Sequence, residues 1–517
     1  MLAGRKNTGR IAGEVFVNGR PKDDRSFRRI MGYVEQFDSL CPHDTAREAL
    51  EFSAALRLPE STPDNVRSAW VESVLDMLEL TSLGNTLVGD SSSQGMSFEQ
   101  KKRVSIGVEL VANPAILFLD EPTSGLDSRA AQVVMRCIKR VAASGRAVVC
   151  TIHQPSVVIF EAFDSLLLLR RGGQTVFFGP LGEDNCNLQE HFESASPSVP
   201  RLRQNQNAAT WMLEVIGAGT GSTTLSAVDF HLYYKNSALC VTNNVHLDSL
   251  CAQHSDADAA RAEAEAEANA MAGSLCRLKP VSCAFGNDAL AHLEQIHRAR
   301  DGPKYNASYS RQFTLLMKRA IMSYWRSPSY NFVRMVISVI IALIFASTYA
   351  DQNYSQEVDV IARTSVIYIT ALFTGVVGMM TVQPVFFSER PAFYREKQSE
   401  MYSVFLYTVA AGVVELPYLA VSSLLFTLPF FFIVGFDQGD VASKFGWYWL
   451  FEALYMSCLV FCGQFLAALM PDAPSAGVIG GVLSTVLSLF AGFMIREENF
   501  PSFWVFLYWL NPLHYGK

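Results

Sequence analysis

The chain has 517 residues, of which half are hydrophobic, 12% are aromatic and only 18% are charged. Globular proteins carry about 25% charged residues, and this composition excludes a disordered chain, a collagen and a small disulfide-stapled scaffold. The net charge of -7 argues against a nucleic-acid-binding protein. The ten cysteines show no metal-binding spacing and are typical of a reducing compartment.

The charged residues are unevenly distributed along the chain. Residues 331–517 carry only 21 of the 91 charged side chains, mostly in clusters between long apolar runs. We therefore predict that residues 1–330 are soluble and that the remainder is embedded in a membrane.

In the first part, short apolar runs alternate with helical patterns. Strands are expected at 11–19, 29–36, 115–121 and 146–152, with a late hairpin over 165–169 and 174–178. Helices are expected at 45–58, 63–80, 97–112 and 128–144. This alternation predicts an α/β domain with a central, mainly parallel sheet.

Acidic residues and a histidine follow two of these strands. Asp120 and Glu121 end one strand, and His153 ends the next. Ligands of parallel sheets gather at the carboxyl ends of the strands. A carboxylate there suits a magnesium ion on a phosphate, and a second acid one step further suits activation of water. By themselves the two acids favour a solvated acidic strand end, and a lone histidine is more often structural.

The surrounding segments favour the catalytic interpretation. Gln36 ends an earlier strand, residues 122–127 (PTSGLD) follow the two acids, and Ser97 begins a helix whose N-terminus is suited to an anion. Each element is weak alone, but their order and spacing together are specific.

Together these segments resemble an ATP-binding cassette transporter of the G type, and within it the second half of a full-length pleiotropic drug resistance transporter. The resemblance covers nearly all of the chain apart from about 235–300. The matching segments are LDEPTSGLD (119–127) for the Walker B motif and D-loop, TIHQPS (151–156) for the switch histidine, GYVEQFD (32–38) for the Q-loop, NAATWMLEV (207–215) for a tract of the drug resistance group, and SRQFTLLMKRAIMSYWRSPSYN (310–331) for the helix leading into the membrane domain.

The resemblance implies a role for each residue at the strand ends, with ATP and magnesium as cofactors. Asp120 would bind magnesium and Glu121 would polarise the attacking water. Gln36 would touch the metal and couple the cassette to the membrane domain. His153 would sense the γ-phosphate.

A second group of residues would face a nucleotide held by a partner domain. The resemblance gives this role to Ser97 and Gln100, and it places Asp127 at the dimer seam. The segment MSFEQ (96–100) corresponds to the signature motif of the family. It departs from that motif, because Phe98 and Glu99 stand where two glycines are expected. Glycine lets a backbone approach phosphate closely. We therefore expect this composite site to bind nucleotide and hydrolyse it poorly.

The phosphate-binding loop of the family, G-x-x-x-x-G-K-[ST], does not occur in the sequence. The resemblance places it just upstream of LAGRKNTG (2–9). We expect the sequence to begin directly after its phosphate loop, as a truncated gene model or fragment, the alternative being a natural pseudo-transporter. As given, the chain should bind ATP weakly or not at all.

Five apolar segments are long enough to be considered as membrane-spanning helices. They are expected at 332–350, 364–387, 413–436, 446–470 and 474–495, with 402–412 as an interfacial lead-in. The basic residues before the first segment and in a loop over 388–401 predict a cytosolic N-terminal side. The resemblance implies a sixth span, which would follow the end of this sequence.

Two acids fall inside these apolar segments. Glu415 and Glu452 are functional candidates because intramembrane acids usually have a role. The alternative is a polar anchor at a kinked helix entry for Glu415 and at a span end for Glu452.

The domain organisation predicted from the sequence is a cassette domain over 1–230, a linker over 231–309 that includes a low-complexity stretch at 255–272, an amphipathic connecting helix over 310–331, and a transmembrane domain over 332–517. The leading functional hypothesis is ATP-driven export of lipophilic or xenobiotic compounds, together with a first cassette and membrane half or a second half-transporter. The plasma membrane is the expected location, with the cassette in the cytosol. The alternative is a membrane scaffold or regulator that binds nucleotide without turnover.

Overall fold

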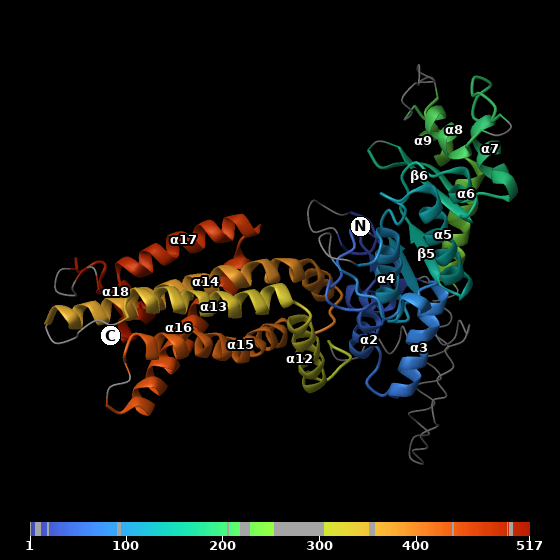
Figure 1. Ribbon diagram of the computed structural model, residues 1–517. Coiled ribbons are helices and arrows are strands. Elements are labelled where there is room, and N and C mark those ends of the chain that lie inside the picture. The colour runs from blue at the N-terminus through green and yellow to red at the C-terminus, as the bar shows by residue number, and fades with distance from the viewer. Residues whose placement is uncertain are drawn as a thin grey trace, which may run out of the picture. The chain divides into compact units, whose positions relative to one another are not determined.

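The computed structural model describes residues 2–5, 12–17, 20–89, 95–170, 172–203, 206–217, 228–252, 304–350, 357–436, 439–493, 495 and 500–516 (Figure 1). The chain forms two compact units. The first consists of Met1–Asp38, Glu72–Thr81 and Ser97–Pro303, and the second of Ser39–Val71, Ser82–Met96 and Lys304–Lys517. Two segments of the expected cassette domain, 39–71 and 82–96, therefore pack with the membrane half.

A three-stranded parallel sheet organises the first unit. It has the order β3 (Met31–Val34), β4 (Ile116–Leu119), β5 (Ala147–Cys150). Helices α4 (Phe98–Leu110) and α5 (Ser128–Ala143) connect these strands along the chain. On α5, residues such as Ala131, Val134, Ile138 and Val141 recur at helical spacing and are buried. The structure thus confirms the expected α/β domain.

A helix occupies part of the segment expected as the strand 29–36. Helix α1 (Asp24–Ile30) ends where β3 begins. Asp23 caps α1, and Arg28 and Arg29 lie in its last turn, where a helix dipole favours cations. These local signals extend the helix up to Ile30. A short ladder of β1 (Phe16–Val17) and β2 (Arg20–Pro21) precedes it.

The late hairpin consists of β6 (Ser165–Arg170) and β7 (Gln174–Pro180), which pair antiparallel with an irregularity at Leu168 and Leu169. Gly172 and Gly173 in its turn have positive φ angles of 93° and 79°. A side chain would be strained in that conformation, so the two glycines allow the turn.

The part of the expected linker that the structure describes is helical. Helix α9 (Phe230–Lys235) and residues 238–252 follow α7 (Cys186–Glu193) and α8 (Ala208–Val215). Phe230 joins the buried cluster around Phe192 and Trp211, and Leu239 packs against the same cluster. The first unit therefore continues past the boundary predicted at residue 230. The low-complexity stretch 255–272 lies outside the described residues.

Long helices form the second unit: α12 (Tyr309–Trp325), α13 (Pro328–Thr348), α14 (Glu357–Gln398), α15 (Val404–Ile433), α16 (Val441–Leu469) and α17 (Ala473–Leu489). Figure 1 shows α13 to α17 running alongside one another. Among the described residues, the four helices α13 to α16 are long and apolar enough to cross a membrane. The helical transmembrane region is therefore confirmed. Helix α17 has 17 residues, about 25 Å, which is shorter than a hydrocarbon core of roughly 30 Å.

Helix α14 continues through most of the loop expected at 388–401. Its 42 residues are about 63 Å long, although Pro384 and Pro391 lie inside it. Its charged end is held by neighbours. Arg390 donates to the carbonyl oxygens at the end of α16, those of Ala467, Met470 and Pro471. Apolar periodicity could not reveal this support.

The other boundaries shift for local reasons. The connecting helix expected over 310–331 is divided, because α12 ends at Trp325 and Pro328 begins α13, a position that suits proline. Residues 404–412, expected as part of an interfacial lead-in, are the first turns of α15.

Candidate nucleotide site

Three parallel strands end at the same edge of the sheet. Val34, Leu119 and Cys150 are aligned across β3, β4 and β5. Asp120 and Glu121 follow β4 directly. Gln36 follows β3 by two positions and His153 follows β5 by three. The register therefore brings all four predicted residues to one edge.

Asp120 is held from both neighbouring strands. The Tyr33 hydroxyl donates to its Oδ2 at 2.8 Å, and the Thr151 hydroxyl donates to its Oδ1 at 2.6 Å. Burial, and then the hydrogen bond to Asp120, raises the pKa of Tyr33 to about 12, so the phenol keeps its proton. Each carboxylate oxygen has a further lone pair, which suits an Mg²⁺ ligand.

Glu121 makes two contacts of its own. Gln36 Nε2 donates to Glu121 Oε2 at 2.7 Å, and the Glu121 N–H donates to Thr151 Oγ1 at 2.9 Å. Its φ angle is 43°, in the left-handed region that a non-glycine residue rarely adopts. Such backbone strain tends to occur at functional sites. The Q-loop glutamine and the second acid are therefore directly connected.

His153 is at the same edge but stands apart from these contacts. Its side chain is exposed and makes no hydrogen bond within the described part of the chain. Gln154, the next residue, has a positive φ of 47°.

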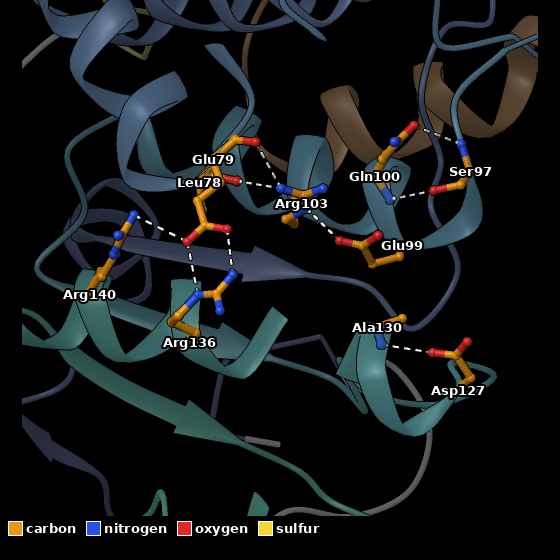
Figure 2. A network of polar contacts seen from close by, with 10 residues as sticks. All are labelled: Leu78, Glu79, Ser97, Glu99, Gln100, Arg103, Asp127, Ala130, Arg136 and Arg140. Atoms are coloured by element: carbon orange, nitrogen blue, oxygen red, sulfur yellow. Dashed lines mark hydrogen bonds and ion pairs between the residues drawn. The ribbon is translucent and has the colours of Figure 1, made fainter. Parts of the chain in front are cut away.

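The second predicted group caps helices. Ser97 and Gln100 form a capping box on α4, in which the Gln100 N–H donates to Ser97 Oγ and the Ser97 N–H donates to Gln100 Oε1 (Figure 2). Asp127 caps α5 by accepting from the Ala130 N–H at 2.7 Å. The structure therefore places these side chains at two helix N-termini, and within the described residues no hydrogen bond joins them to Asp120 or Glu121.

The two residues that replace the signature glycines have partners. Glu99 forms an ion pair with Arg103 at 2.8 Å, one helical turn along α4. Figure 2 shows that Arg103 also donates to the carbonyl oxygens of Leu78 and Glu79. Phe98 is about half exposed, and its ring lies beside Gly125 of the D-loop segment. The charge of Glu99 is thus balanced, whereas the bulk of Phe98 remains at the helix start.

Sequence reasoning missed a buried lysine behind the site. Lys102 of α4 forms an ion pair with Asp38 at 3.0 Å and donates to the carbonyl oxygen of Gln36 at 2.8 Å. In the sequence, Lys102 is the middle of a Lys-Lys-Arg run, which reads as a solvated helix face. Tyr33 and Thr151 lie within the Q-loop and switch-histidine segments, but sequence reasoning assigned neither of them a role.

The described residues contain no group of three or more His, Cys, Asp or Glu side chains placed to hold a metal. Magnesium does not require one, since it usually takes one or two carboxylates and fills the remaining positions with phosphate oxygens and water. Asp120, with Gln36 nearby, is therefore a donor set that fits Mg²⁺ bound to a nucleotide.

Another polar group lies in the second unit, where α2 (Ala46–Arg57) meets the end of α12. Arg326 forms a bidentate ion pair with Glu48 and donates to the His43 carbonyl oxygen at 2.9 Å. The hydrogen bond from Arg326 lowers the pKa of Glu48 to about 2. This contact joins a segment that follows the Q-loop to the helix that leads into the membrane.

Two family models match the chain. The model described as "ABC transporter" matches residues 1–124, and the one described as "ABC-2 type transporter" matches residues 311–516. Among solved structures, a crystal structure of a nucleotide-free ATP-binding cassette from an ABC transporter aligns with 34% of this chain over 72% of the cassette's own length, at 19% identity with a TM-score of 0.29.

Several plant proteins are similar over nearly the whole chain. ABC transporter G family member 38 of Oryza sativa subsp. japonica is 38% identical over 515 residues, which are 99% of this chain and 31% of the relative. Pleiotropic drug resistance protein 1 of Nicotiana tabacum is 38% identical over 515 residues, and protein TUR2 of Spirodela polyrhiza is 37% identical over 520 residues. Each alignment covers 99% of this chain and 33% of the relative. The chain thus spans about a third of the length of these relatives.

Proposed function

Because the chain belongs to the G family of ABC transporters, we propose that it is part of an ATP-driven exporter of lipophilic or xenobiotic compounds. Its partner is a first cassette and membrane half, or a second half-transporter. The plasma membrane is the proposed location, with the first unit in the cytosol. The names of the Nicotiana tabacum and Spirodela polyrhiza relatives refer to drug resistance, which supports the class of substrate.

One observation carries the proposal. The contacts Tyr33–Asp120, Thr151–Asp120 and Gln36–Glu121 gather the Q-loop and Walker B side chains at one sheet edge. Bound magnesium would supply charge neutralisation on the phosphates of ATP. Asp120 would hold that ion, and Glu121 would orient and polarise water. Gln36 already contacts Glu121, so it is placed to respond when a nucleotide arrives. His153, exposed and unbonded in the described structure, is free to turn toward a γ-phosphate.

The second unit supports the coupling step. Motion of the segment after the Q-loop would act on α12 through the Arg326–Glu48 pair, since this contact has two hydrogen bonds with charged partners. Helix α12 leads directly into α13. The expected substrate position is near the membrane midplane, against the partner half.

The test is Glu121→Gln in the complete transporter. This change keeps the shape of the side chain and removes the charge that polarises water. We expect ATP hydrolysis to fall by at least 100-fold and resistance to exported compounds to be lost. The matched control is Glu190→Gln, an exposed acid of α7 outside the site. Unchanged export by the Glu121 variant would refute the proposal.

A second candidate is a membrane scaffold or regulator that binds nucleotide without turnover. Phe98 favours it, because its ring beside Gly125 adds bulk where a phosphate would approach the start of α4. Measurements of ATP binding and hydrolysis on the complete transporter separate the two candidates. Binding without hydrolysis or export would support the scaffold.

A further inference from the structure

Two acidic side chains are completely buried in the membrane half. Glu415 on α15 and Glu452 on α16 both have 0% exposure. A carboxylate is expensive to bury unless it is paired, and otherwise the carboxyl group keeps its proton. The partners of the two acids therefore decide which form each one takes.

Glu415 has the partners of a carboxylate. Arg334 Nη1 lies 3.2 Å from Glu415 Oε2. The hydroxyls of Tyr324 and Tyr330 donate to Oε1 at 2.8 and 2.7 Å. One cation and two further donors stabilise the ionised form, so Glu415 is expected to carry its negative charge.

Glu452 has a different environment. Its Oε1 is hydrogen bonded to the hydroxyl of Thr374 on α14, while its Oε2 has no partner within the described residues. No basic side chain in this part of the chain forms an ion pair with it. Tyr455 lies one turn along α16, and its hydroxyl is also buried without a described partner.

A count of hydrogen atoms shows that the Thr374 hydroxyl cannot serve every acceptor that lies near it. The Thr374 oxygen lies 2.9 Å from the Thr370 carbonyl oxygen and 3.0 Å from that of Ala371. A hydroxyl has a single hydrogen, and a carbonyl oxygen can only accept it. With that hydrogen directed at the helix backbone, the bond between Thr374 and Glu452 needs a hydrogen from the acid.

One alternative source of charge is Arg334. Its Nη2 lies 3.9 Å from the position that a Cβ would take at Gly378, one helical turn after Thr374. Through a water molecule it could serve Glu452, which would then be ionised. Because Arg334 already faces Glu415, the observations favour a neutral Glu452.

We propose that Glu452 is a proton-binding site of the membrane half, a neutral carboxylic acid that donates its proton to Thr374 between α14 and α16. The two intramembrane acids thus have opposite protonation states. These helices pack closely, with Tyr455 against Gly375, and Glu452 is fully buried between them.

Infrared difference spectroscopy of the full chain in lipid tests this proposal. At pH 8 exposed acids are ionised, and a protonated carboxyl group absorbs above the amide and carboxylate bands. We expect the wild type to show such a band and Glu452→Gln to lose it. The control is the double variant Arg334→Gln with Glu415→Gln, which should keep the band.

A second variant covers the case in which Glu452→Gln does not fold. Thr374→Val removes the acceptor, so the band should remain and shift to higher frequency. Absence of the band from the wild type would overturn the proposal, and so would its loss in the double variant or an unshifted band in Thr374→Val. None of these results depends on ATP hydrolysis.

Discussion

Lys102 of α4 and Asp38 form a buried ion pair, with the lysine Nζ 3.0 Å from the carboxylate and side-chain exposures of 0% and 3%. Lys102 also donates to the carbonyl oxygens of Glu35 and Gln36. One ammonium group therefore fixes the backbone of the Q-loop segment to the helix that begins with the signature motif. The position of Gln36 at the site depends on it.

Replacing Lys102 with methionine should destabilise the first unit strongly. The change removes one partner of a buried ion pair, and breaking such a pair costs about 3–5 kcal/mol. We expect a clear fall in the thermal midpoint of the purified chain. Lys139→Met is the matched control, because the pair of Lys139 with Asp164 is exposed and should contribute less than about 1 kcal/mol. Equal midpoints for the two variants would contradict this prediction.

The altered signature predicts a gain of activity. Phe98→Gly combined with Glu99→Gly restores the small residues that let a backbone approach phosphate. ATP hydrolysis by the complete transporter should rise several-fold. Two glycines in the first turn of α4 should also cost about 1 kcal/mol each, so the thermal midpoint should fall slightly. An unchanged rate of hydrolysis would show that Phe98 and Glu99 do not limit turnover.

Asp44 makes the stability of the second unit depend on pH. Burial is the main cause that raises its pKa to about 7, and nearby Arg319 offsets part of the effect. The unfolded aspartate has a pKa near 3.8, so between about pH 4 and pH 7 the folded protein binds a proton that the unfolded chain releases. Stability from this group is complete below pH 4 and is lost as the pH rises through 7.

Asp44→Asn should remove that loss. At pH 8 the variant should melt at a higher temperature than the wild type, and the difference should shrink toward pH 4. Glu48 provides the opposite control, because Arg326 lowers its pKa to about 2. Its stabilising effect is present above about pH 4.5, so Glu48→Gln should lower the midpoint at neutral pH. A pH-independent difference for Asp44→Asn would contradict the assignment.

The strand-end residues could be predicted from the sequence because each of them lies at or just after the end of a recognisable strand. Asp120, Glu121 and Gln36 each end a short apolar run, and parallel strands end at one edge. The residues that support them could not be found in this way. Tyr33 lies inside a strand and Thr151 follows one, and their contacts depend on the register between strands, which no local pattern specifies.

The helix boundaries in the membrane half could not be predicted for the same reason, since they depend on contacts distant in sequence. Apolar length located the helices, but α14 extends to Gln398 because Arg390 and the Arg319–Glu396 pair hold its polar end. The order of the chain places segment 39–71 in the cassette. Its packing with residues 304–517 depends on contacts such as Arg326–Glu48. These two residues are more than 270 positions apart in the sequence.

The final prediction concerns the ion pair between Arg334 and Glu415. The sequence left open whether Glu415 is functional or a polar anchor, and the structure shows it fully buried with a cation and two tyrosine hydroxyls. Glu415→Gln leaves the guanidinium without a counter-charge, which should cost about 3–5 kcal/mol.

The double variant, with Arg334→Gln as well, should be more stable than Glu415→Gln alone, because no uncompensated charge then remains in the bundle. A double-mutant cycle on thermal midpoints in detergent measures the coupling between the two side chains. If export by the double variant is normal, the pair only anchors α13 to α15. If the variant is stable but export is lost, the charges take part in transport. Additive effects of the two changes would show that the ion pair is not formed.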